Sequence, residues 1–95
     1  MIKEDTILMD SNKFGRLLSE KLEETESKSC YLYLRRYALE NDIQSFIKYF
    51  SNLCFENNIK LPVSISNILT YDNTLQVNVI YSIMLGLITD LEDLK

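Results

Sequence analysis

The side chains that most often carry enzyme chemistry are scarce in this chain of 95 residues. It contains no histidine, which removes the commonest general base and the commonest metal ligand. Two cysteines are too few for a four-ligand zinc site, and they lack the C-x-x-C spacing of a redox motif. The sequence also lacks a glycine-rich phosphate loop, a G-x-S-x-G turn and an H-E-x-x-H helix. We therefore expect no catalytic residue, no metal site and no cofactor.

Acidic side chains cluster within residues 20–26 and 90–93, where a pair of carboxylates could serve as general acid and base. Both clusters are expected on a solvated helix face or a terminal segment, so a solvated acidic surface is the preferred interpretation. The enzyme hypothesis is correspondingly weak.

The state of the two cysteines indicates the cellular compartment in which the protein works. Cys54 falls on an apolar helical stripe, where a buried and reduced thiol is usual. A Cys30–Cys54 disulfide in a secreted protein is the alternative. No secretion signal opens the chain, and the uncharged run 73–89 contains too many polar residues for a membrane span. We expect a cytoplasmic protein with no membrane contact.

Basic and aromatic side chains in the middle of the chain are better candidates for a functional surface. Eight of the ten Lys and Arg lie within residues 11–60, although the chain as a whole has a net charge of −4. Tyrosines alternate with these cations, and Phe55 lies outside the apolar stripe of its expected helix. An aromatic beside a cation suits base stacking or a protein-interface anchor. The structural alternative is that the tyrosines pack in the core and the cations pair with neighbouring glutamates.

The elements that must position these residues are expected to be helices. Two glycines and one proline leave little turn punctuation, which argues against an all-β fold. The sequence predicts an all-α protein, a compact bundle of about five helices in one domain spanning 1–95. The expected helices lie near 12–27, 30–40, 43–57, 64–70 and 74–91, with 1–10 and 92–95 as flexible ends.

Details of the pattern sharpen this expectation. Asp10 or Ser11 is expected to cap the first helix, and Gly15 indicates either a close helix–helix approach or a weak helix start. The helix near 30–40 is apolar on nearly all sides and is expected to be central. Residues 75–79 alternate like a strand, but the length of the apolar pattern favours a helix. The expected core consists of Phe14, Leu18, Leu34, Phe46, Ile47, Phe50, Leu53, Ile80, Ile83, Met84 and Leu87.

Three segments together resemble a known family. Residues 12–20, which contain Gly15-Arg16-Leu17, resemble the "GRL" helix in the C-terminal part of the large subunit of type I CRISPR Cascade complexes. That part is also made separately, by internal translation, as the small subunit of these complexes. Residues 33–37 resemble the family's later helix with an arginine–aromatic pair, and residues 83–87 its final glycine-containing helix. The similarity covers about residues 12–89.

The resemblance implies a non-catalytic helical small subunit of an RNA-guided antiviral complex, present in several copies. It would bind other subunits of the ribonucleoprotein, meeting guide RNA and target DNA indirectly or through a local basic surface. Together with the position of the cations, it implies nucleic-acid contacts by Arg16, Lys28, Arg35, Arg36 and Lys48. The alternative is a small acidic helical inhibitor or immunity-type protein that binds a basic surface on a protein target.

Overall fold

The computed structural model describes residues 3–93, and all regular secondary structure in this part of the chain is helical. The predicted all-α class is confirmed, and residues 74–81 are helical as expected. None of the helices within the described range is long and apolar enough to cross a lipid bilayer. The elements in chain order are α1 (Glu4–Lys21), α2 (Glu24–Glu40), α3 (Ile43–Glu56), α4 (Val63–Ser66), the 3-10 turn η1 (Ile68–Thr70) and α5 (Asn73–Asp93).

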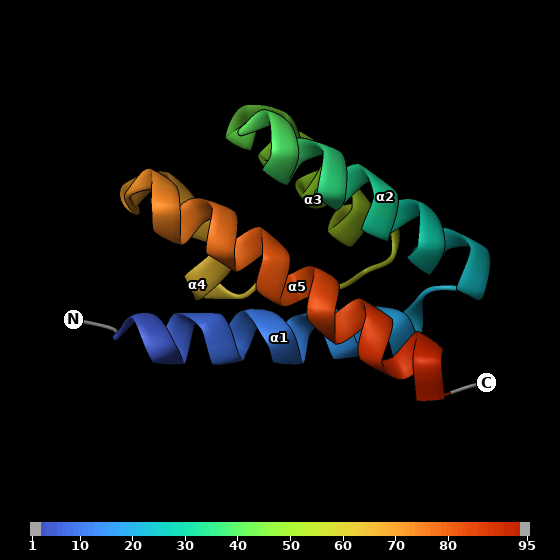
Figure 1. Cartoon of the computed structure of the whole chain (residues 1–95). Coiled ribbons are helices and arrows are strands. Elements are labelled where there is room, and N and C mark those ends of the chain that lie inside the picture. The colour runs from blue at the N-terminus through green and yellow to red at the C-terminus, as the bar shows by residue number, and fades with distance from the viewer. Residues whose placement is uncertain (1–2, 94–95) are drawn as a thin grey trace.

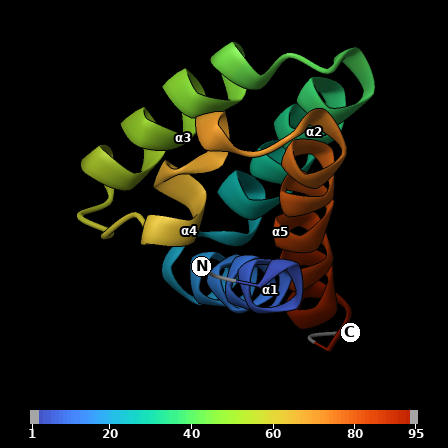
Figure 2. The same ribbon diagram turned by 90° about the vertical axis from the view of Figure 1, so that its left-hand side faces the viewer.

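The last helix, α5, joins the first two helices of the bundle. It packs along α1 on one side and along α2 on the other (Figure 1). Figure 2 shows α3 and α4 on the opposite side of the bundle from α5. Side chains of α5 such as Val79, Ile80 and Ile83 are completely buried. The expectation that α2 would be central was wrong, because Leu32 and Leu39 of α2 face solvent.

The first helix begins earlier than the sequence predicted. α1 starts at Glu4. The acidic side chains of Glu4 and Asp5 in its first turn interact favourably with the positive end of the helix dipole. Ser11 is not a cap: its hydroxyl is buried within the helix and donates a hydrogen bond to the carbonyl of Ile7, 2.8 Å away. Residues 4–10 are therefore two helical turns and not a flexible end.

The break between the first two helices also lies earlier than expected. α1 ends at Lys21 and α2 begins at Glu24, whereas the sequence predicted a break near residues 26–29. The acidic residues Glu24 and Glu26 occupy the first turn of α2, where the helix dipole favours them. At the other end of the chain, α5 continues through Asp93, and residues 94–95 of the expected flexible end lie outside the described range.

The ends of the later helices follow the sequence more closely. Asp42 caps α3, with its carboxylate accepting a hydrogen bond from the backbone N–H of Ser45 at 3.1 Å. Asn41, just after α2, and Asn58, just after α3, both adopt the left-handed conformation that asparagine tolerates. The chain is extended at Pro62, immediately before α4.

Aromatic rings from α1 and α3 fill the middle of the core. The ring centroid of Phe50 lies 5.6 Å from that of Phe14 and 5.0 Å from that of Phe46. Most of the expected core is confirmed, but Ile47 and Leu53 are only partly buried. Gly15 of α1 and Gly86 of α5 meet where these helices cross, which confirms the close approach that Gly15 indicated.

Candidate interaction surface

The five cations expected to bind nucleic acid are spread over three helices. Two of them form exposed ion pairs one turn along α2: Lys28 Nζ lies 3.2 Å from Glu24 Oε1, and Arg36 Nε lies 3.1 Å from Glu40 Oε1. Such surface pairs are weak, but they partly neutralise the cation. Lys28 and Arg36 thus pair with neighbouring glutamates, which is the structural alternative to a role in binding nucleic acid.

The other three expected cations, Arg16 on α1, Arg35 on α2 and Lys48 on α3, are exposed. None of them forms an ion pair with a side chain in the described part of the chain. They are the ones available to an external anionic group.

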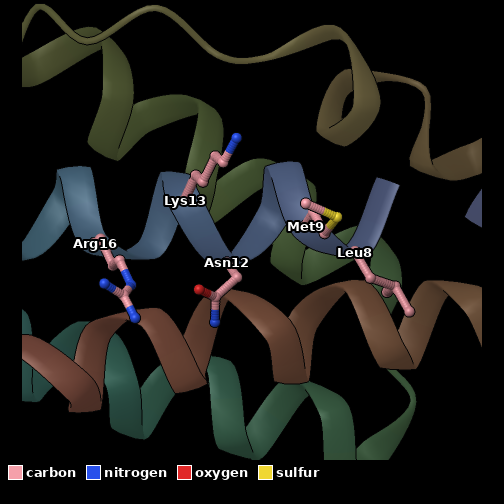
Figure 3. Close-up of a pocket in the computed structure, with 5 residues that line it drawn as sticks. All are labelled: Leu8, Met9, Asn12, Lys13 and Arg16. Atoms are coloured by element: carbon pink, nitrogen blue, oxygen red, sulfur yellow. The ribbon is translucent and has the colours of Figure 1, made fainter. Parts of the chain in front are cut away.

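Arg16 and Arg35 lie on opposite sides of the same turn of α5. The backbone N of Arg16 would be 2.9 Å from a Cβ placed on Gly86. Arg35 lines a groove with Leu85, the residue before Gly86. In Figure 3 the Arg16 side chain points toward α5, and that of Lys13 points away from it. The structure thus brings two of the five expected site residues to one place, and no contact joins Lys48 to them.

The groove between α2 and α5 is lined mainly by apolar side chains. Its volume is about 170 Å³, below the roughly 300–1,000 Å³ of typical small-molecule sites. Two of its leucines are more than half exposed, Leu39 at 66% and Leu85 at 59%. The groove therefore suits a protein surface better than a small ligand. Its lining residues are Tyr31, Arg35, Leu39, Tyr81, Met84, Leu85 and Ile88.

A second hollow, of about 420 Å³, lies on α1 beside the same part of α5. All its lining residues come from that one helix, so it is a depression on an open surface: Leu8, Met9, Asn12, Lys13 and Arg16. Asn12 Nδ2 donates a hydrogen bond to the carbonyl of Ser82, at 3.4 Å, which joins the hollow to α5. We call the exposed strip of α5 and its two borders the α5 face, defined by Arg16, Arg35, Leu39, Tyr81, Leu85 and Ile88.

The tyrosines of the middle segment pack on one another. The ring centroid of Tyr49 lies 4.8 Å from that of Tyr33 and 6.0 Å from that of Tyr37. Burial raises the pKa of the Tyr49 hydroxyl above its ordinary value, with a further contribution from the neighbouring Cys30 thiol. These rings stabilise the contact between α2 and α3, but they lie at the edge of the core: Tyr37 and Tyr49 are partly buried and Tyr33 is 46% exposed.

Both thiols are unsuited to covalent chemistry. Cys30 and Cys54 are free and buried. Burial raises the pKa of Cys30 to about 12 and that of Cys54 to about 11, so both are protonated at neutral pH and are poor nucleophiles. The side chains described in the structure include no group of three or more His, Cys, Asp or Glu that could hold a metal ion.

Phe55 is 87% exposed, as its position outside the apolar stripe of α3 predicted. It lines a hollow with Asn58 and Lys60, not with the residues of the α5 face. The sequence did not show that Leu39, Tyr81 and Leu85 lie on the surface, because α2 and α5 carry apolar residues on nearly all their sides and the pattern does not tell which side is buried. The spacing of Tyr81, Leu85 and Ile88 at i, i+4 and i+7 is the signal that could have indicated a second apolar stripe.

No family model, curated protein or solved structure matches this chain. The resemblance to Cascade small subunits thus stays a prediction.

Proposed function

We propose that this protein is a non-catalytic helical subunit that works by docking on another protein. The observation that carries the proposal is the α5 face, where apolar side chains at helical spacing lie between two arginines that form no ion pair with any side chain the structure describes. Each Å² of apolar surface that is removed from water contributes about 25 cal/mol to the free energy of binding. A partner that covers Leu39 and Leu85 would therefore form a complex stabilised by their burial, whereas in the isolated chain both side chains stay in water.

The composition of the α5 face is that of a protein interface. Aromatic residues and arginine are enriched at such interfaces relative to the rest of a protein surface. Tyr81, Arg16 and Arg35 supply both kinds here. The core beneath is complete without Leu85, because Ile83 and Leu87 on the inner side of α5 are fully buried. The exposed apolar residues are therefore not needed to hold the bundle together.

The small subunit of a type I Cascade complex is one specific protein of this class. In that role the chain would brace neighbouring subunits through the α5 face and help to hold the displaced DNA strand. The guanidinium groups of Arg16 and Arg35, which pair with no carboxylate among the described side chains, support a contact with an anionic partner. Fewer observations support a role in holding the DNA strand than a role in bracing subunits. Lys28 and Arg36 form ion pairs with glutamates, and the net charge of the chain is −4.

The alternative, an acidic inhibitor of a basic target, has less support from the fold. Such a protein needs its carboxylates on one surface. The acidic first turn of α1, at Glu4 and Asp5, lies at one end of the molecule, and α5 ends at Asp93 toward the other (Figure 1). The acidic ends of the chain are thus separated along its length.

A matched pair of leucine variants tests the docking proposal. Leu85 on the α5 face and Leu69 in η1 are 59% and 58% exposed, so glutamate at either site should leave the fold intact. We expect affinity-tagged wild-type protein and Leu69→Glu to co-purify the same proteins from the source cells, and Leu85→Glu to lose them. Circular dichroism melting curves check that both variants are folded. Identical co-purification by all three proteins would refute docking through the α5 face.

A further inference from the structure

We propose that the partner segment bound by the α5 face is an acidic amphipathic helix. This inference rests on the proposed docking function and adds the chemistry of the partner. It follows from the shape of the groove and from the placement of the two arginines beside it.

The groove is lined by two rows of side chains with helical spacing. Tyr81, Leu85 and Ile88 follow one another along α5, and Tyr31, Arg35 and Leu39 follow one another along α2. The two helices run side by side in opposite directions (Figure 1). From Tyr81 to Ile88 the groove is roughly 10 Å long at 1.5 Å per residue, or two turns of a partner helix. An apolar groove between two helices is a common docking site for the apolar face of a third.

The charges beside the groove select an acidic helix. Arg35 lies in the wall that α2 forms, and Arg16 lies across α5 on the α1 side. Glu20, one turn after Arg16, forms no ion pair with it, and neither arginine is paired with any other described side chain. A helix whose apolar residues cover Leu85 would carry its flanking residues over these two guanidinium groups. Carboxylates at the flanks would form charge-assisted hydrogen bonds with both.

A second copy of this chain fits the same face less well. In a symmetric dimer each residue of the face meets the same face of its partner. A two-fold axis through Leu85, lying in the interface, would place Arg16 near the partner's Arg16 or the partner's Arg35. Juxtaposed like charges at an interface are strongly unfavourable. The charge pattern therefore favours an acidic partner over self-association.

Nucleic acid is also a poorer match for this face. Phosphates could pair with the arginines and Tyr81 offers one ring, but the most exposed side chains of the groove are Leu39 and Leu85, which offer no stacking surface. Bases bound on proteins stack mainly on aromatic rings or guanidinium planes. The tyrosines Tyr33, Tyr37 and Tyr49, which could have served, pack on one another.

The test uses designed peptides and the full chain. One probe is a helical peptide of about 18 residues, long enough to hold helical structure, with leucines on one face and glutamates on both flanks. Its counterpart carries lysine in place of every glutamate, and the third probe is a single-stranded oligonucleotide. We expect the acidic peptide to bind more tightly than the basic peptide and the oligonucleotide, and Arg16→Glu/Arg35→Glu to weaken its binding by at least about tenfold. The control variant Lys48→Glu/Lys60→Glu, with the same change in net charge, should bind like the wild type.

Other outcomes would overturn the inference. No binding of the acidic peptide, or equal binding of the acidic and basic peptides, contradicts an acidic partner. Oligonucleotide binding that is tighter than binding of the acidic peptide and depends on Arg16 and Arg35 assigns the face to nucleic acid. A dimer in sedimentation equilibrium that Leu85→Glu dissociates assigns it to a second copy. These failures differ from failure of the docking function itself, which appears when Leu85→Glu keeps the wild-type partners in co-purification.

Discussion

Gly15 of α1 and Gly86 of α5 lie against each other where the two helices cross, with no room for a side chain on either. A Cβ placed on Gly15 would lie 3.1 Å from the Cα of Gly86 and would overlap the carbonyl oxygen of Ile83. A Cβ on Gly86 would lie 3.0 Å from the Cα of Gly15 and would overlap the carbonyl oxygen of Asn12. This contact sets the distance between α1 and α5, and with it the position of Arg16 beside the α5 face.

Alanine at either glycine should destabilise the protein, although alanine normally favours a helix by about 0.5–1 kcal/mol over glycine. The new methyl group would meet backbone atoms of the other helix, which cannot move aside without separating the helices. We expect Gly15→Ala and Gly86→Ala each to lower the free energy of unfolding by about 3 kcal/mol or more. Urea denaturation measures this change. The exposed helical substitution Ser29→Ala is the control, and stabilisation by all three alanines would contradict the close contact.

Two phenylalanines of α3 should respond very differently to truncation. Phe50 is 1% exposed and packs against the rings of Phe14 and Phe46, whereas Phe55 is almost fully exposed. We expect Phe50→Ala to cost about 3–5 kcal/mol, since it leaves a cavity in the core. Phe55→Ala should change stability by less than about 0.5 kcal/mol. Chemical denaturation of both variants checks the pair, and a loss below about 1 kcal/mol for Phe50→Ala would show that the core is packed differently.

Ser27 offers a route to stabilisation. Its hydroxyl is completely buried in α2 and has no hydrogen-bond partner among the described residues. A buried polar group without a partner retains its desolvation cost of about 1–3 kcal/mol. We expect Ser27→Ala to raise the melting temperature, because it removes that cost and favours the helix. Ser29→Ala, at an exposed site of the same helix, controls for helix propensity, and a melting temperature no higher than the control's would show that the Ser27 hydroxyl is satisfied.

The buried thiols predict a loss of stability at high pH. Because burial raises the folded-state pKa of Cys30 to about 12, from about 9.0, the protonated thiol stabilises the fold below about pH 9. This contribution is lost as the pH rises from about 9 toward 12, where the unfolded chain ionises first. Melting temperatures should therefore fall more steeply above pH 9 in the wild type than in Cys30→Ala. Parallel curves for the two proteins would show that the thiol does not carry this dependence.

The cation pattern predicts weak, salt-sensitive binding of single-stranded DNA by the isolated chain. Each phosphate neutralised on a single strand contributes about 0.7 to the log–log salt slope. Arg16, Arg35 and Lys48 form no ion pair with a described side chain. If only these three cations bind phosphate, the slope should not exceed roughly 2, whereas all five would give roughly 3.5. Fluorescence anisotropy at several salt concentrations measures it. Lys28→Gln/Arg36→Gln should leave the slope unchanged. A shallower slope in that variant would show that Lys28 and Arg36 also bind phosphate.

The sequence by itself determined the fold class, most of the core and the local structure of the later helices. The apolar stripe Phe46–Phe50–Cys54 predicted the inner face of α3, and the same stripe predicted that Phe55 would be exposed. Asn58 follows that helix in the left-handed conformation that asparagine tolerates at a helix end. These features depend on residues within one or two turns of each other, so a short stretch of sequence contains the interactions that decide them.

The boundary between α1 and α2 could not be derived from the same pattern. Acidic residues at 23–26 fit a solvated late turn of one helix as well as the first turn of the next, and the apolar spacing does not distinguish the two. Placing the break at Leu22 and Glu23 requires the packing of Leu22 in the core, which depends on the other helices.

The α5 face was likewise decided only by the tertiary structure. Leu34 and Leu39 are the same residue type on one helix, yet the first is completely buried and the second is 66% exposed. What separates them is which sides of α2 and α5 are covered by neighbouring helices. That choice depends on the meeting of Gly15 and Gly86, which lie in the first and last helices of the chain. Periodicity identifies an apolar side of a helix, but only contacts between distant segments decide whether that side is buried or left for a partner.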